Sequence, residues 1–166
     1  MNRKVLFLDY DGVLHPSEVY RNPEGRIYLA KEFADDGHFL FEHAHFLIHI
    51  LEQVEAVRPV EIILSTSWVE VLGGVEPAKA WLPAELQQRV KGAVWDSRFT
   101  TQNRLQQIKR YVSANGLKQH EWVAIDDNLD TWAVRNKYRR NLVLTHQFIG
   151  LGSATIQREL YSKLMA

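Results

Sequence analysis

The sequence contains no cysteine, no excess charge of either sign and no long apolar run. Without cysteine the chain cannot form a disulfide, a thiolate zinc site or a cysteine nucleophile. Its 20 basic and 20 acidic side chains cancel, so bulk charge does not indicate a nucleic acid or a membrane as partner. No segment approaches the roughly 18 apolar residues that a membrane span requires. We therefore expect no disulfide partner, no membrane partner and a reducing compartment.

The N-terminus enters an apolar segment directly, without a basic stretch followed by a long apolar leader. We accordingly expect a cytoplasmic protein. The chain has 166 residues, of which 46% are hydrophobic, and this is enough to bury the core of one globular domain. We expect a single domain over residues 1–166, in which residues 15–38 and 69–100 form short insertions or a lid.

Apolar runs typical of buried strands alternate along the chain with segments of helical periodicity. Strands are expected at residues 5–8, 60–64, 121–125 and 141–145, with a short strand at 93–95 and a hairpin around 26–29. Helices are expected at residues 42–57, 102–115 and 155–165, with a short helix from residue 69 and one or two short helices over 77–90. This alternation predicts an α/β fold: a Rossmann-like three-layer sandwich with a mainly parallel sheet and helices on both faces. Four tryptophans are expected in its core, namely Trp81, Trp95, Trp122 and Trp132.

The first strand ends in two aspartates, Asp9 and Asp11, and Gly12 follows them. The carboxyl end of a strand is the usual place for chemistry in an open α/β sheet. Two carboxylates this close repel each other unless a cation or a shared proton intervenes. The pair suggests a hard metal ion, Mg²⁺, which favours oxygen ligands and accompanies phosphates.

Two later strands also end in polar residues. Ser65, Thr66 and Ser67 follow the strand at 60–64, and Asp126-Asp127 follows the strand at 121–125. Because the carboxyl ends of parallel strands lie at one edge of the sheet, we expect these groups to converge with the first aspartate pair. The serine-rich run would also cap a helix, and a helix N-terminus favours anions, so the two roles do not compete.

Three segments carry a resemblance to a known family: Leu8–Leu14, Ile63–Trp68 and Ala124–Asp127. They resemble motifs one, two and four of the haloacid dehalogenase-like (HAD) hydrolases. The resemblance covers the chain from the first strand to about residue 130. It is closest to small phosphatase-like members, including the branch associated with RNA-repair systems. It implies a HAD-like fold with a minimal cap domain or none.

The resemblance assigns a role to each aspartate of the first pair. Asp9 is implied to be the nucleophile that forms an aspartyl-phosphate intermediate. Asp11 is implied to be the general acid and then the general base, with its backbone carbonyl on Mg²⁺. Asp126 and Asp127 are implied to complete the metal shell, and Asp127 is favoured as the direct ligand. His15, just beyond the motif, either contacts a leaving group or serves the fold.

The resemblance also implies a group that binds the phosphate. Thr66 would donate its hydroxyl to a phosphate oxygen with help from the backbone N–H of Ser67, and Ser65 is the alternative. The family places a basic residue near the start of the helix that precedes the motif-four strand. Arg104 lies in the first turn of the expected helix and is the preferred residue. The alternatives are Lys109 and Lys91.

Together these features predict a magnesium-dependent phosphohydrolase that acts on phosphoric monoesters. The short insertions indicate an open site, so the phosphorylated substrate is expected to be bulky, such as a nucleic-acid end or a phosphoprotein. A small-metabolite phosphatase is the alternative if residues 15–38 cover the site. A catalytically degenerate domain that only binds a phosphate or a partner is a further alternative. A receiver-like domain is disfavoured, because there the phosphoacceptor and the acidic pair lie on different strands.

Overall fold

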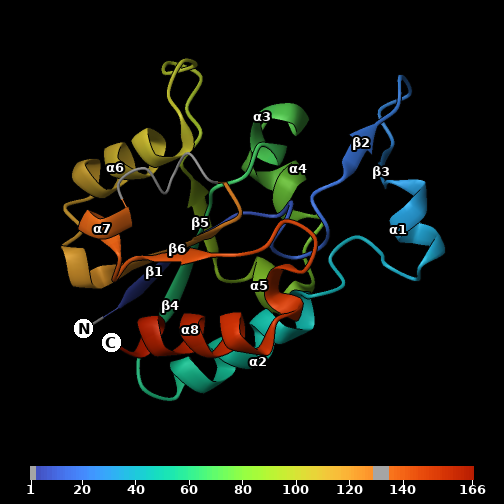
Figure 1. Cartoon of the computed structure of the whole chain (residues 1–166). Helices are drawn as coiled ribbons and strands as arrows, with labels where there is room; N and C mark the ends of the chain where they lie inside the picture. The colour runs from blue at the N-terminus through green and yellow to red at the C-terminus, as the bar shows by residue number, and fades with distance from the viewer. Residues whose placement is uncertain (1–2, 129–134) are drawn as a thin grey trace.

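The computed structural model of the chain describes residues 3–128 and 135–166. Its centre is a parallel sheet with the strand order β5-β4-β1-β6-β7 (Figure 1). The strands are β1 (Lys4–Leu8), β4 (Val60–Leu64), β5 (Val90–Ala93), β6 (Trp122–Asp126) and β7 (Leu142–Leu144). The chain runs from β1 to β4 and β5 on one side, then returns past β1 to β6 and β7 on the other. The topological switch point, where such sheets bind ligands, therefore lies at the carboxyl end of β1.

The alternation of side chains along β1 divides the core into two parts. Leu6 and Leu8 belong to a cluster that includes apolar residues of α2 (Ala44–Glu55) and α8 (Ala154–Met165). Phe7 points to the opposite face and packs in a second cluster with α6 (Arg104–Ala114). Figure 1 shows α2 and α8 on one side of the sheet and α6 on the other. The predicted three-layer, Rossmann-like α/β fold with a parallel sheet is confirmed.

The connection between β1 and α2 contains regular structure of its own. Strands β2 (Val19–Arg21) and β3 (Ile27–Leu29) form an antiparallel hairpin, and α1 (Lys31–Asp35) follows it. The hairpin expected around residues 26–29 is therefore present. In Figure 1 the hairpin and α1 stand at one side of the molecule, beyond the end of β1.

The remaining elements are short and lie mostly between strands. They are α3 (Trp68–Leu72), α4 (Val75–Lys79), α5 (Ala84–Gln87), α7 (Arg135–Tyr138) and the 3₁₀ helices η1 (Gln119–Glu121) and η3 (Gly150–Gly152). The strand expected at 93–95 was placed too late, because β5 begins at Val90, which pairs with Ile62. Among the described residues, no helix is long and apolar enough to cross a membrane.

The core prediction for the tryptophans holds only in part. Trp122 is buried and Trp95 packs against the core at partial exposure. Trp81 is 41% exposed, although its ring packs against those of Trp68 and Phe41. Trp132 lies outside the described residues.

Candidate active site

The register of the three central strands places Asp9, Ser65 and Asp126 in one row. Leu8 pairs with both Leu64 and Ile125, so the next residue of each strand lies level with the other two. The N–H of Ser65 donates to the Leu8 carbonyl at 2.8 Å, and that of Asp9 donates to the Ile125 carbonyl at 3.3 Å. Because side chains alternate along a strand, the row lies on the face that Phe7 shares with α6. Of the groups expected to converge, the structure therefore brings Asp9, Ser65 and Asp126 together at one sheet edge.

Three carboxylates gather at this edge. One oxygen from each of Asp9, Asp126 and Asp127 lies within 4.8 Å of the others. Asp9 and Asp126 are only 6% and 3% exposed. The buried Oδ2 of Asp126 has no hydrogen-bond partner among the residues that the structure describes. A buried acceptor without a donor is costly, and a bound cation would satisfy it.

Burial and mutual repulsion both disfavour the charged forms of this cluster. Burial and then the charge of Asp126 raise the pKa of Asp9 well above its usual value. Burial likewise raises the pKa of Asp126, and Arg104 opposes that change. Burial and the neighbouring Asp126 raise the pKa of Asp127 to about 6. A hard divalent cation would remove this repulsion, so the all-oxygen donor set fits Mg²⁺.

Gly12 allows Asp127 to approach the turn after β1. The residue has φ of 78°, a conformation that favours glycine. The turn is anchored from the chain beyond β7: the Thr145 hydroxyl donates to the Gly12 carbonyl at 2.7 Å, and the Leu151 N–H donates to the Val13 carbonyl at 2.9 Å. Sequence reasoning did not identify Thr145. The sequence feature that could have identified it is its position at the end of a strand, at the same sheet edge as the motifs.

Arg104 is the basic residue that the structure brings to the carboxylates. It begins α6, whose N-terminus is held by a capping box between Asn103 and Gln106. Its Nη1 lies 3.4 Å from the Ser65 hydroxyl, and its positive charge lowers the pKa of both Asp9 and Asp126 against the other influences on them. The two alternatives, Lys109 on α6 and Lys91 on β5, are exposed.

The polar residues after β4 do not all face the carboxylates. Ser65 lies in the row with Asp9 and beside Arg104. The Thr66 hydroxyl instead accepts the N–H of Trp68 at 3.3 Å, within its own turn. Ser67 is exposed and directly precedes α3. The geometry therefore favours Ser65, the alternative at this position, over Thr66 as the hydroxyl beside Asp9.

Asp11 stands apart from the carboxylate cluster. Its Oδ1 accepts one hydrogen bond from His15 Nε2 and another from Trp68 Nε1, both at 2.8 Å. The His15 side chain is fully buried, so it cannot contact a leaving group and serves the Asp11 side chain instead. Tyr10, between the two aspartates, points into the core and donates its hydroxyl to the Ala78 carbonyl at 3.0 Å.

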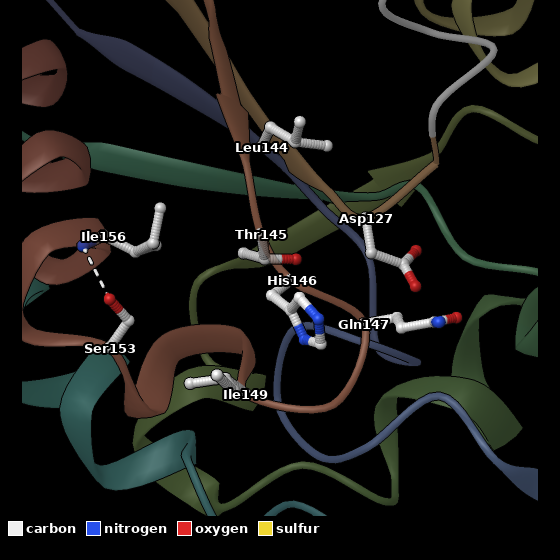
Figure 2. A pocket seen from close by; sticks show the side chains of 8 residues that line it. All are labelled: Asp127, Leu144, Thr145, His146, Gln147, Ile149, Ser153 and Ile156. Carbon is white, nitrogen blue, oxygen red and sulfur yellow. Dashed lines mark hydrogen bonds between the residues drawn. The ribbon is translucent and has the colours of Figure 1, made fainter.

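Two hollows flank the cluster. One, of about 140 Å³, is lined by Asp11, Trp68 and residues of the β2–β3 hairpin, including Tyr20 and Arg21. The other, of about 630 Å³, lies on the Asp127 side. Figure 2 shows Asp127 at its edge, above His146 and Gln147 from the segment after β7. We call these the Asp11 hollow and the Asp127 hollow.

The family model described as "HAD domain in Swiss Army Knife RNA repair proteins" matches residues 5–156. The chain belongs to this HAD family. The predicted resemblance is thereby confirmed, and the match spans the row, the cluster and both hollows. A solved structure described as a 3-deoxy-D-manno-octulosonate 8-phosphate phosphatase from Vibrio cholerae shares 14% identity with this HAD domain. It aligns over 99% of this chain and 84% of its own, with a TM-score of 0.47. None of the curated proteins matches the chain.

Proposed function

We propose that this HAD domain is a magnesium-dependent phosphohydrolase that cleaves phosphoric monoesters through an aspartyl-phosphate on Asp9. One observation carries the proposal: a single row places Asp9 between the metal-fitting carboxylate of Asp126 and the phosphate-binding pair of Ser65 and Arg104. A second carboxyl, that of Asp11, stands outside the cluster at the mouth of a hollow. This arrangement supplies a nucleophile, charge neutralisation and a separate proton donor.

Asp9, Asp126 and Asp127 would hold Mg²⁺, with Asp127 as the favoured direct ligand and the Asp11 carbonyl as a further one. When bound there, Mg²⁺ would supply positive charge to phosphate oxygens that otherwise repel the attacking carboxylate. Asp9 attacks as the carboxylate, although burial raises the pKa of that carboxyl. Arg104 and the Ser65 hydroxyl bind the remaining phosphate oxygens and orient phosphorus toward Asp9.

In the first step an Asp9 carboxylate oxygen attacks phosphorus, and the bond from phosphorus to the ester oxygen breaks. Asp11 gives its proton to that oxygen, so the leaving group departs as an alcohol. In the second step a water molecule attacks phosphorus of the aspartyl-phosphate and loses a proton to Asp11, and the bond from phosphorus to the Asp9 oxygen breaks. Inorganic phosphate leaves, and both aspartates return to their starting forms.

The substrate we propose is the phosphorylated end of a nucleic acid. The family description names RNA repair proteins, and Asp11, the proposed proton donor to the departing alcohol, lines the Asp11 hollow. Tyr20 and Arg21 of the hairpin line this hollow, and the exposed ring of Tyr28 lies beside that of Tyr20. Bases of single strands stack on such rings, and arginine neutralises their phosphates.

The proposal is tested by assaying magnesium-dependent hydrolysis of an aryl phosphate by the wild-type chain and Asp9→Asn. We expect the wild type to be active and the variant to lose activity by several orders of magnitude. A panel of 3′- and 5′-phosphorylated oligonucleotides, nucleotides, sugar phosphates and phosphopeptides then identifies the leaving group. Undiminished turnover by Asp9→Asn contradicts the nucleophile assignment. A preference for sugar phosphates over oligonucleotide ends would support the small-metabolite alternative.

A further inference from the structure

The Asp11 carboxyl is held at one oxygen by two donors from separate parts of the fold. His15 Nε2 and Trp68 Nε1 both lie 2.8 Å from Oδ1. His15 comes from the turn after β1, and Trp68 begins α3 beyond β4. A carboxyl that accepts two convergent hydrogen bonds at one oxygen cannot rotate without breaking both. The other oxygen, Oδ2, makes no hydrogen bond within the described residues, and the side chain is 29% exposed and lines the Asp11 hollow.

The contacts of His15 determine which of its nitrogens carries the proton. The backbone N–H of Phe41 donates to Nδ1 at 3.0 Å, so Nδ1 is an acceptor and bears no hydrogen. The hydrogen of the neutral ring then lies on Nε2 and points at Asp11. Trp68 offers an indole N–H, which is a donor only. Both partners therefore give hydrogen bonds to Oδ1, and neither can accept one from it.

The surroundings hold both rings in place. His15 packs edge-on against Phe41, and Trp68 does the same against Phe41 and Tyr10. Phe41 adopts φ of 63°, a left-handed conformation that is rare for a bulky residue. This unfavourable backbone presents the N–H that fixes the His15 tautomer. Strained residues of this kind are concentrated at functional sites, where the surrounding structure maintains them.

We propose that His15 and Trp68 are positioning residues that reserve the Oδ2 atom of Asp11 for proton transfer to the leaving group. This inference rests on the proposed phosphohydrolase function and deepens it. A proton on Oδ1 would clash with the two donor hydrogens, so the acid form of Asp11 carries its proton on Oδ2. Asp11 lines the hollow proposed for the leaving group, and Oδ2 is the oxygen that the two donors leave available to it. The two donors thus determine which oxygen of Asp11 carries the proton and how that oxygen is oriented.

The kinetic test compares substrates whose leaving groups differ in their need for a proton. An alkyl phosphate needs protonation of its leaving oxygen, whereas 2,4-dinitrophenyl phosphate does not. The parameter is kcat/KM, which reports the steps up to formation of the aspartyl-phosphate. For Trp68→Phe and His15→Asn we expect a loss of about 10- to 100-fold on the alkyl ester, part of the 10²–10⁴-fold that a general acid supplies. The loss on the dinitrophenyl ester should be smaller than about threefold by the same reasoning.

Two matched variants separate orientation from packing. His15→Gln places an amide N–H near the position of Nε2, whereas the shorter Asn of His15→Asn can replace only Nδ1. We expect His15→Gln to recover much of the alkyl-ester activity. Trp81 belongs to the same aromatic cluster but makes no hydrogen bond to Asp11 within the described residues. Trp81→Phe should therefore leave the ratio of kcat/KM for the two esters unchanged. A uniform loss on both substrates in Trp68→Phe and His15→Asn would overturn the inference.

A second measurement does not depend on activity. ¹⁵N NMR of the ring nitrogens should show His15 with hydrogen on Nε2 only, and the signals of His15 and Trp68 Nε1–H should both move in Asp11→Ala. A His15 ring with hydrogen on Nδ1, or an indole signal unaffected by Asp11→Ala, would overturn the inference even in an active enzyme. Absence of wild-type turnover together with the expected spectra would instead overturn the proposed function and, with it, the catalytic use of this arrangement.

Discussion

Gly12 lies so close to Asp127 that a Cβ atom added to it would stand 2.0 Å from Asp127 Oδ2. The contact joins the turn that carries Asp11 to the strand end that completes the carboxylate cluster. Gly12 therefore determines how Asp127 faces the cluster, as well as how the chain turns after β1.

We expect Gly12→Ala to weaken Mg²⁺ binding by about 10- to 100-fold, because Asp127 must move to make room for the methyl group. The matched control is Gly116→Ala. Gly116 also has positive φ, 62°, but nothing lies within 4 Å of its Cβ position. Both variants should lose about 1 kcal/mol of stability from backbone strain. Isothermal titration with Mg²⁺ distinguishes them, and equal affinities in the two variants would contradict the role of the contact.

The stability of the metal-free protein should fall as the pH rises from about 4 to 7. The folded state raises the pKa of Asp127 to about 6, so between the unfolded and folded values it binds more protons than the unfolded state does. The stabilisation is complete below the unfolded pKa and is lost as the pH passes about 6. Stabilisation by Mg²⁺ should grow over the same interval, because the ion requires deprotonated carboxylates.

Thermal denaturation with and without Mg²⁺ at pH 5 and pH 7.5 measures this effect. Asp127→Asn cannot titrate, so its metal-free melting temperature should fall less than that of the wild type between the two pH values. At pH 7.5 the rise in melting temperature that Mg²⁺ causes should be smaller in Asp127→Asn than in the wild type. Identical pH dependence in the two proteins would show that Asp127 does not have the raised pKa.

Replacing Arg104 should reduce kcat/KM far more than replacing the other basic residues considered for this role. Arg104 is the one beside Ser65, and its charge acts on Asp9. We expect Arg104→Ala to lose about 10²- to 10³-fold, as for removal of a preorganised group that stabilises developing negative charge. Lys109→Ala, on the exposed side of the same helix, is the control and should remain close to the wild type. A larger loss in Lys109→Ala would reassign the phosphate-binding cation.

Blocking one hollow should show where the leaving group lies. Val71 and Ile149 are exposed to a similar extent, 47% and 51%, and they line the Asp11 and Asp127 hollows respectively. We expect Val71→Trp to raise KM for a phosphorylated oligonucleotide about tenfold, equivalent to about 1.4 kcal/mol, while a small aryl phosphate is unaffected. Ile149→Trp should change neither. The opposite pattern would place the leaving group in the Asp127 hollow.

The sequence was sufficient to predict the parallel sheet and the convergence at its edge. Both follow from apolar runs that end in polar residues, and the register then makes Asp9 level with Asp126. The sequence could not decide between Ser65 and Thr66, because that choice depends on which face of β4 each residue occupies. β5 was misplaced for a related reason. Its irregular pairing with β4 begins at Val90, within a segment that carries no clear alternation.

The partners of Asp11 could not be predicted from sequence periodicity. His15 lies four residues beyond Asp11 in a turn, and Trp68 lies 57 residues away, so their convergence depends on tertiary structure. The left-handed backbone of Phe41 also has no signature in the sequence, because bulky residues rarely adopt it. Gly12 was recognisable as a turn residue, but its contact with Asp127 was not.

The most direct test of the account is to trap the phosphoenzyme. Asp11→Asn, incubated with Mg²⁺ and an aryl phosphate and then quenched in acid, should retain one phosphoryl group, because its second step lacks a base. Peptide mass spectrometry should locate that group on Asp9, and the double variant that also carries Asp9→Asn should retain none. A phosphoryl group on any other residue, or hydrolysis by the wild type with no trapped intermediate in Asp11→Asn, would contradict Asp9 as the nucleophile.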